Sequence, residues 1–161
     1  MSLSSQNITL YVASDHAGFP LKKILVEYLE KTRSSETFKV EDLGTVSEDK
    51  KCDYPDNAAE VGQKVTEETT GSEVKAGLLI CGTGIGMSIA ANKVAGVRCA
   101  LCHDHYTAEL SRQHNDANIL AIGSRTTEPD VAKEILDTYL DSSFLGEYHS
   151  IRVKKIHQLE H

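Results

Sequence analysis

The chain has 161 residues, of which 40% are hydrophobic, and its formal net charge is −7. This length predicts a single domain over residues 1–161 with a sizeable buried core. The acidic balance argues against non-specific binding to nucleic acid or to an anionic membrane surface.

No apolar run approaches the length of a membrane span, and the first residues lack the apolar segment of a signal peptide. We therefore expect a cytoplasmic protein, in which the four cysteines stay reduced. The last three residues, Leu159 to His161, resemble a vector remnant, so no function is assigned to them.

Short apolar runs alternate with helical patterns along the chain. The first run, residues 8–14, predicts a buried strand because it is β-branched and uncharged. The helical pattern over residues 19–31 begins with a proline that fits a first turn. Its apolar residues repeat at helical spacing and are expected to face inward: Leu21, Ile24, Leu25, Tyr28 and Leu29.

Four more strands and five more helices are expected. The strands are residues 38–44, 75–81, 97–102 and 118–123, and the helices are 58–69, 85–94, 105–114, 128–141 and 147–158. In the helix over 128–141, five residues are expected to face the core: Ala132, Ile135, Leu136, Tyr139 and Leu140. The alternation predicts an α/β fold, a three-layer α/β/α sandwich with a five-stranded, parallel, Rossmann-like sheet and a C-terminal helix.

Ligands of such sheets bind at the carboxyl ends of the strands, so the residues that follow each strand are the candidate site. Asp15 and His16 follow the first strand, the loop with Tyr54 follows the second, and Arg125 follows the fifth. His-Asp-His-Tyr follows the fourth strand, and Arg-Gln-His-Asn-Asp comes one helix later. We expect most of these acid–base candidates to lie at or near one edge of the sheet.

The stretch Cys-Gly-Thr-Gly-Ile-Gly, residues 81–86, follows the third strand. Its spacing differs from the G-x-G-x-x-G dinucleotide fingerprint, and it lacks the Gly-Lys-Ser/Thr of a Walker loop. Two interpretations remain. One is a tight turn, and the other is an anion cradle in which backbone N–H groups and a helix N-terminus face the ligand.

Cys81 ends its strand at the mouth of this loop. Free cysteine is often a buried core residue, but positive potential at the loop would favour a thiolate. A thiolate beside an anion hole suits attack on an acyl or phosphoryl group. It equally suits proton abstraction next to a carbonyl, with the hole binding the enediolate.

Cys99, Cys102 and His103 match the C-x-x-C-H string of c-type haem attachment. Zinc bound by these residues and His105 is a second alternative. Both conflict with the expected buried strand, on which residues three apart point to opposite faces. Two core cysteines are the favoured interpretation.

Several motifs closely resemble ribose-5-phosphate isomerase type B: SDHAGFPLK, DYPD, CGTGIGMSIAANK, LSRQHNDANILAIGSR and HSIRV. The resemblance runs from the first strand to the tail. It implies interconversion of ribose 5-phosphate and ribulose 5-phosphate through a cis-enediolate, without metal or cofactor. It also implies a homodimer, or a tetramer built from it, with sites shared between subunits.

The resemblance also implies the roles of individual residues. Cys81 is the base that moves the proton between carbons 2 and 1, and Thr83 supports the anion hole. His114 opens the sugar ring, and Asp15 holds sugar hydroxyls and assists that step. Substrate binding is implied for ten residues: His16, Tyr54, Gly82, Gly84, Ile85, Gly86, Asn115, Arg125, His149 and Arg152. Among them, His16, Arg125 and Arg152 match phosphate-binding positions.

One departure from the family pattern stands in the tail. Where the family often has arginine before the tail histidine, this chain has Tyr148 before His149. A phosphate contact could therefore be missing, with Lys154 and Lys155 as candidates to replace it. Two alternatives stay open: an isomerase of galactose 6-phosphate or allose 6-phosphate, and a non-catalytic module that binds an anion.

Overall fold

The computed structural model describes residues 1–69 and 71–160 of the chain. These residues contain five strands, which pair parallel throughout in the order β2-β1-β3-β5-β4. The strands are β1 (Ile8–Ser14), β2 (Phe38–Gly44), β3 (Val74–Cys81), β4 (Cys99–Leu101) and β5 (Ile119–Gly123). The predicted five-stranded parallel α/β fold is confirmed.

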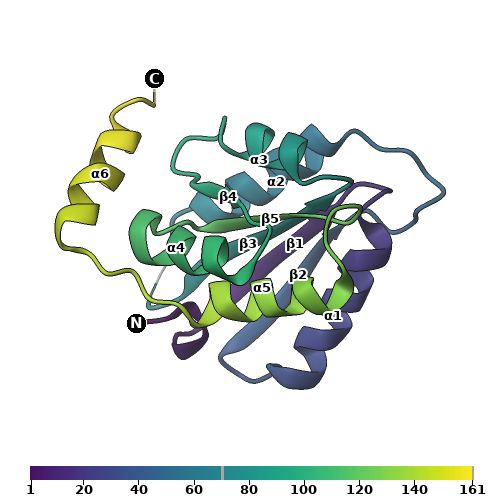
Figure 1. Ribbon diagram of the computed structural model, residues 1–161, viewed down its shortest axis with the longest axis horizontal. Helices are drawn as coiled ribbons and strands as arrows, with labels where there is room; N and C mark the ends of the chain where they lie inside the picture. The colour runs from purple at the N-terminus through teal and green to yellow at the C-terminus, as the bar shows by residue number, and fades with distance from the viewer. Residues whose placement is uncertain (70, 161) are drawn as a thin grey trace.

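The helices of the described chain cover both faces of the sheet. They are α1 (Phe19–Thr32), α2 (Tyr54–Thr66), α3 (Ile85–Ala91), α4 (His105–Asn115), α5 (Pro129–Asp141) and α6 (Glu147–His157), with a short 3-10 turn η1 (Leu3–Ser5) before them. Buried residues of α1, α4 and α5 pack on one face, and those of α2 and α3 pack on the other. In Figure 1, α6 lies at one end of the molecule, beyond α4.

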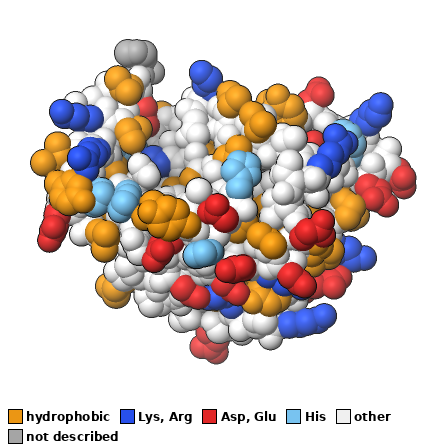
Figure 2. Space-filling view, viewed as in Figure 1, with side chains coloured by type: hydrophobic (Ala, Val, Ile, Leu, Met, Phe, Trp, Pro, Cys, Tyr) orange, Lys and Arg blue, Asp and Glu red, His pale blue; other side chains and the backbone are white. Residues whose placement is uncertain are grey.

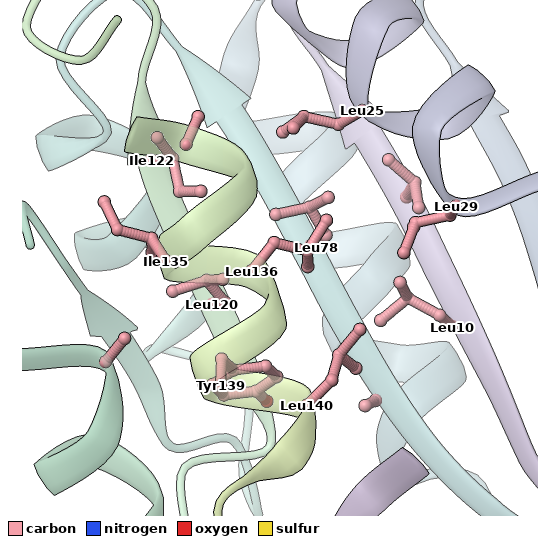
Figure 3. Packing of buried hydrophobic residues seen from close by; sticks show 14 of the residues in the cluster. Leu10, Leu25, Leu29, Leu78, Leu120, Ile122, Ile135, Leu136, Tyr139 and Leu140 are labelled. Atoms are coloured by element: carbon pink, nitrogen blue, oxygen red, sulfur yellow. The ribbon is translucent and has the colours of Figure 1, made fainter. Parts of the chain in front are cut away.

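The alternation of side chains along β3 divides the core in two. Leu78 and Ile80 belong to the cluster beneath α1 and α5, whereas Leu79 and Cys81 belong to the cluster beneath α2 and α3. Figure 3 shows the first cluster, in which α5 places Ile135, Leu136, Tyr139 and Leu140 against the sheet. All five residues predicted to face inward from α5 are buried.

Four sequence-based expectations need correction. Ile24 is 38% exposed rather than inward, because the four-residue spacing of Leu21, Leu25 and Leu29 already fills the contact of α1 with the sheet. The second helix is Tyr54–Thr66 rather than 58–69. It can begin early because Pro55 lies in the first turn, where a backbone N–H has no helical partner. The fourth strand is Cys99–Leu101 rather than 97–102, and the third helix ends at Ala91 rather than at residue 94.

None of the helices in the described part of the chain is long and apolar enough to cross a membrane.

Candidate active site

The carboxyl ends of β1, β3 and β5 bring together one set of the predicted site residues. In the sheet register Ser14 pairs with Ile80, and Cys81 pairs with Gly123. The residues that follow these strands therefore emerge side by side. The set at this edge comprises Asp15, His16, Tyr54, Cys81, Gly82, Thr83, Gly84, Ile85, Gly86 and Arg125.

Asp15 and His16 occupy the turn between β1 and α1. Asp15 is 7% exposed, and its carboxylate accepts a hydrogen bond of 2.9 Å from the Gly18 N–H. This bond fixes the turn and leaves the second carboxylate oxygen for other donors. His16 Nδ1 is buried and has no hydrogen-bond partner among the described residues. Because buried polar atoms are nearly always satisfied, this nitrogen is an unused hydrogen-bonding atom at the edge of the sheet.

The glycine loop turns sharply between β3 and α3. Gly84 adopts φ +75°, in the left-handed region that disfavours residues with a Cβ. A Cβ there would also lie 2.5 Å from Leu101 Cδ1. The turn directs the Gly84 N–H back to Cys81 Sγ, to which it donates a hydrogen bond of 3.1 Å. Cys81 is 5% exposed at the end of β3, and through this hydrogen bond its thiol contacts the loop.

Two larger side chains pack closely against the small residues of this loop. A Cβ on Gly86 would lie 2.5 Å from the ring of Tyr54, so only glycine allows that ring to rest on the loop. The guanidinium of Arg125 lies next to Gly82, 3.4 Å from the position of a Cβ. The Arg125 N–H donates to the Gly82 carbonyl oxygen at 2.9 Å, which ties the two segments together. A cation, an aromatic ring and the thiol thus surround one loop.

The remaining predicted residues lie elsewhere: His114, Asn115, His149 and Arg152. His114 and Asn115 end α4, which runs antiparallel to the strands and returns the chain to their amino ends. The expectation that the candidate residues lie at or near one edge of the sheet is therefore wrong for these residues within one chain. His114 precedes the amino end of β5, whereas Cys81 pairs with Gly123 at its carboxyl end. The two residues are therefore separated along the strand direction by at least the length of β5, roughly 13 Å.

The second set is built on stacked rings. His114 and His149 stack with centroids 4.2 Å apart and planes 12° from parallel. Tyr148 packs on His149 at 4.1 Å, and the Arg152 guanidinium lies 4.8 Å from the Tyr148 ring centroid. Figure 2 shows histidine, hydrophobic and basic side chains gathered at this end, over α6. Burial lowers the pKa of His149, and the nearby His114 and Arg152 lower it further.

Sequence reasoning missed Arg98, which fixes the end of α4. Its guanidinium donates to the Asn115 carbonyl at 3.1 Å and to the Asp116 carbonyl at 2.7 Å. Asp116 ends the helix in the left-handed conformation, at φ +46°. The only hint in the sequence is an arginine inside the apolar run Val-Arg-Cys-Ala-Leu-Cys.

The cysteines of the C-x-x-C-H string lie on opposite faces of the sheet. Cys99 packs against the cluster of α2 and α3, whereas Cys102 belongs to the cluster of α1 and α5. Burial raises the pKa of both thiols, that of Cys102 to about 11. Cys102 is thus a buried core cysteine, and Cys99 is a partly buried one packed against the core.

Comparison with known proteins identifies the family. The ribose/galactose isomerase family model matches residues 10–156 of the chain. The chain belongs to the ribose/galactose isomerase family. Ribose-5-phosphate isomerase B of Escherichia coli (strain K12) is 46% identical over 146 residues, which cover 91% of this chain and 92% of that protein. The resemblance seen in the sequence motifs is thereby confirmed.

Solved structures of family members share the fold. Ribose-5-phosphate isomerase B from Mycoplasma genitalium, with bound ribulose-5-phosphate, has a TM-score of 0.87 at 41% identity, covering 96% of this chain and 97% of that one. The type B ribose 5-phosphate isomerase of Trypanosoma brucei has a TM-score of 0.86 at 43% identity, covering 96% and 99%. These family members align over nearly their full lengths with this chain.

Proposed function

We propose that the protein is an aldose-ketose isomerase that interconverts D-ribose 5-phosphate and D-ribulose 5-phosphate. The observation that carries the proposal is the Cys81 thiol at the mouth of the glycine loop, with the Gly84 N–H aimed at its sulfur. The family relatives named for this reaction, and the Mycoplasma genitalium structure with bound ribulose-5-phosphate, support the choice of substrate.

The chemistry follows from the placement of the thiol. As a thiolate, Cys81 takes the proton from carbon 2 of the open-chain aldose, and the electron pair of that C–H bond forms the enediolate. Negative charge then develops on an oxygen, where donors already fixed in the loop stabilise it. A proton passes from the hydroxyl on carbon 2 to the oxygen on carbon 1, and the thiol returns its own proton to carbon 1, which gives the ketose and regenerates the thiolate. Thr83 supports the loop, since its hydroxyl accepts from the Ile85 N–H at 3.4 Å.

Ring opening and phosphate binding are assigned to the other residues. His114 moves the proton that opens the cyclic sugar, Asn115 binds its hydroxyls and Asp15 assists. Tyr54 lines the pocket beside Gly86. Three side chains with nitrogen donors bind the phosphate: His16, whose Nδ1 lacks a protein partner among the described residues, Arg125 and Arg152.

These roles require two copies of the chain. Cys81 and His114 lie at opposite ends of the sheet, too far apart to reach one five-carbon sugar. We therefore propose a homodimer in which the Cys81 edge of one subunit faces the His114 edge of its partner. Two-fold symmetry then creates two equivalent sites, each with residues from both chains.

A substrate panel tests this function. Purified protein is offered ribose 5-phosphate, galactose 6-phosphate and allose 6-phosphate, with Cys81→Ser as the matched control. We expect turnover of ribose 5-phosphate that disappears in the control. Preference for a six-carbon sugar phosphate would reassign the substrate. Binding of sugar phosphates without any turnover would identify a non-catalytic anion-binding module.

A further inference from the structure

The five arginines of the chain fall into two groups by their partners. Arg33, Arg98 and Arg112 each form an ion pair with a nearby aspartate. Among the described residues, no carboxylate lies within ion-pair distance of Arg125 or Arg152. The charges of these two arginines are left for an anion from outside the chain.

Arg152 is held by a ring in place of a carboxylate. Its guanidinium carbon lies 4.8 Å from the centroid of Tyr148, which is one helical turn earlier on α6. Residues at this spacing lie on the same face of a helix. A guanidinium over an aromatic face is attracted by the negative face of the ring. This contact orients the cation but leaves its charge in place, whereas a carboxylate would neutralise it.

Tyr148 is itself held in place. Its ring packs against His149 at 4.1 Å, and His149 is 5% exposed and stacked on His114. Tyr148 is nevertheless 56% exposed, so it contributes little to the buried core. An unbroken series of contacts therefore runs from the end of α4 through three rings to the Arg152 guanidinium.

We propose that Tyr148 is a positioning residue that holds Arg152 in the orientation that binds the substrate phosphate. The inference rests on the proposed function, in which Arg152 is a phosphate ligand. It also gives a physical role to the position where this chain departs from the family arginine. The aromatic ring supplies no charge of its own, but it restricts the flexible Arg152 side chain and lowers the entropy lost on binding.

The test compares Tyr148→Leu with the matched control Tyr148→Phe, which keeps the aromatic face. In Tyr148→Leu we expect the KM for ribose 5-phosphate to rise about threefold, the range of an exposed cation–π contact, with kcat within about twofold. The inhibition constant of inorganic phosphate should rise by the same factor. Tyr148→Phe should match the wild type. An unchanged KM in Tyr148→Leu, or an equal loss in Tyr148→Phe, would overturn the proposal.

A double substitution shows whether the effect passes through Arg152. In an Arg152→Ala background, Tyr148→Leu should change neither the KM for ribose 5-phosphate nor the inhibition constant of inorganic phosphate any further, because the effects of coupled residues are non-additive. An added loss equal to that of the single variant would show that Tyr148 acts independently and would overturn the proposal.

An NMR titration with inorganic phosphate tests the role of Tyr148 independently of whether the protein turns over a sugar phosphate. If wild-type protein turns over no sugar phosphate, the function fails. The role of Tyr148 is then still decided by whether Tyr148→Leu, and not Tyr148→Phe, weakens binding of inorganic phosphate by about threefold. Equal phosphate affinity in all three proteins would overturn it.

Discussion

The backbone N–H of Gly84 donates a hydrogen bond to Cys81 Sγ across 3.1 Å, at the end of a buried strand. An amide dipole aimed at sulfur stabilises negative charge on it. The same loop continues past the thiol to Gly86, on which the Tyr54 ring packs. In the proposed reaction, the hydrogen bond from Gly84 stabilises the thiolate that accepts the proton.

Replacing Cys81 with alanine should abolish turnover while leaving the fold intact. Removal of a positioned general base costs about 10²- to 10⁴-fold in rate. We expect that loss in kcat, measured with ribose 5-phosphate, and a circular dichroism spectrum like that of the wild type. Activity within a few-fold of wild type would contradict the role of Cys81 as the base.

Alkylation gives an independent check of the same residue. Iodoacetamide should inactivate the enzyme and sugar phosphate should protect it, with the label mapped by mass spectrometry to Cys81. Cys52 is half-exposed and serves as the internal comparison. Inactivation that accompanies labelling at Cys52 alone would count against a reactive Cys81.

The sequence predicted the strands and the core helices because their patterns are local. The alternation of Leu78, Leu79 and Ile80 and the inward face of α5 depend only on periodicity. The sequence does not show the early start of α2 at Tyr54, because a proline such as Pro55 is favourable both in a loop and in the first turn of a helix. Ile24 was misplaced because the pattern alone does not show how wide a stripe of α1 the sheet contacts.

The separation of the candidate site residues between two opposite edges of the sheet could not be predicted from residue patterns. His114 follows a strand and then a helix, and the helix carries it to the opposite edge from Asp15 and Cys81. Position along the chain does not reveal this, whereas the antiparallel direction of α4 does. The stack of His149 and Tyr148 on His114 joins residues far apart in the chain, which no local pattern encodes.

His114 can be tested by separating ring opening from proton transfer. His114→Ala should slow conversion of ribose 5-phosphate, whose main forms are cyclic. On ribulose 5-phosphate, an open-chain ketose, solvent exchange of the carbon 1 proton needs no ring opening. We therefore expect exchange, measured by NMR in deuterium oxide, to fall less than net isomerisation. Equal losses in both assays would instead point to a structural or general binding role.

The buried His149 should make stability depend on pH. Burial lowers the pKa of His149 in the folded protein below its ordinary value of about 6.5. At pH values between the two pKa values, the unfolded chain therefore binds the proton more readily than the folded chain does. This contribution to stability is therefore lost as pH falls below about 6.5. Between pH 7.5 and 5.5, the Tm of wild type should fall more than that of His149→Gln. Equal falls would show that His149 contributes nothing.

The opposite positions of Cys81 and His114 make a test of the shared site possible. Cys81→Ala and His114→Ala homodimers each contain two broken sites. In a mixed dimer, one site collects both substitutions and the other collects neither. Equal amounts of the two chains, associated at random, give about half mixed dimers, and each has one intact site of two.

Activity in that mixture should therefore recover to roughly a quarter of wild type. The two chains must be co-expressed or exchanged through the unfolded state, because a stable dimer need not swap subunits. Distinct affinity tags isolate the mixed dimers and prove that they form. The matched control pairs Cys81→Ala with Cys81→Ser, for which every site of the mixed dimer lacks the thiol. If isolated Cys81→Ala/His114→Ala dimers are as inactive as this control, both residues act in one chain's site and the interface is wrong.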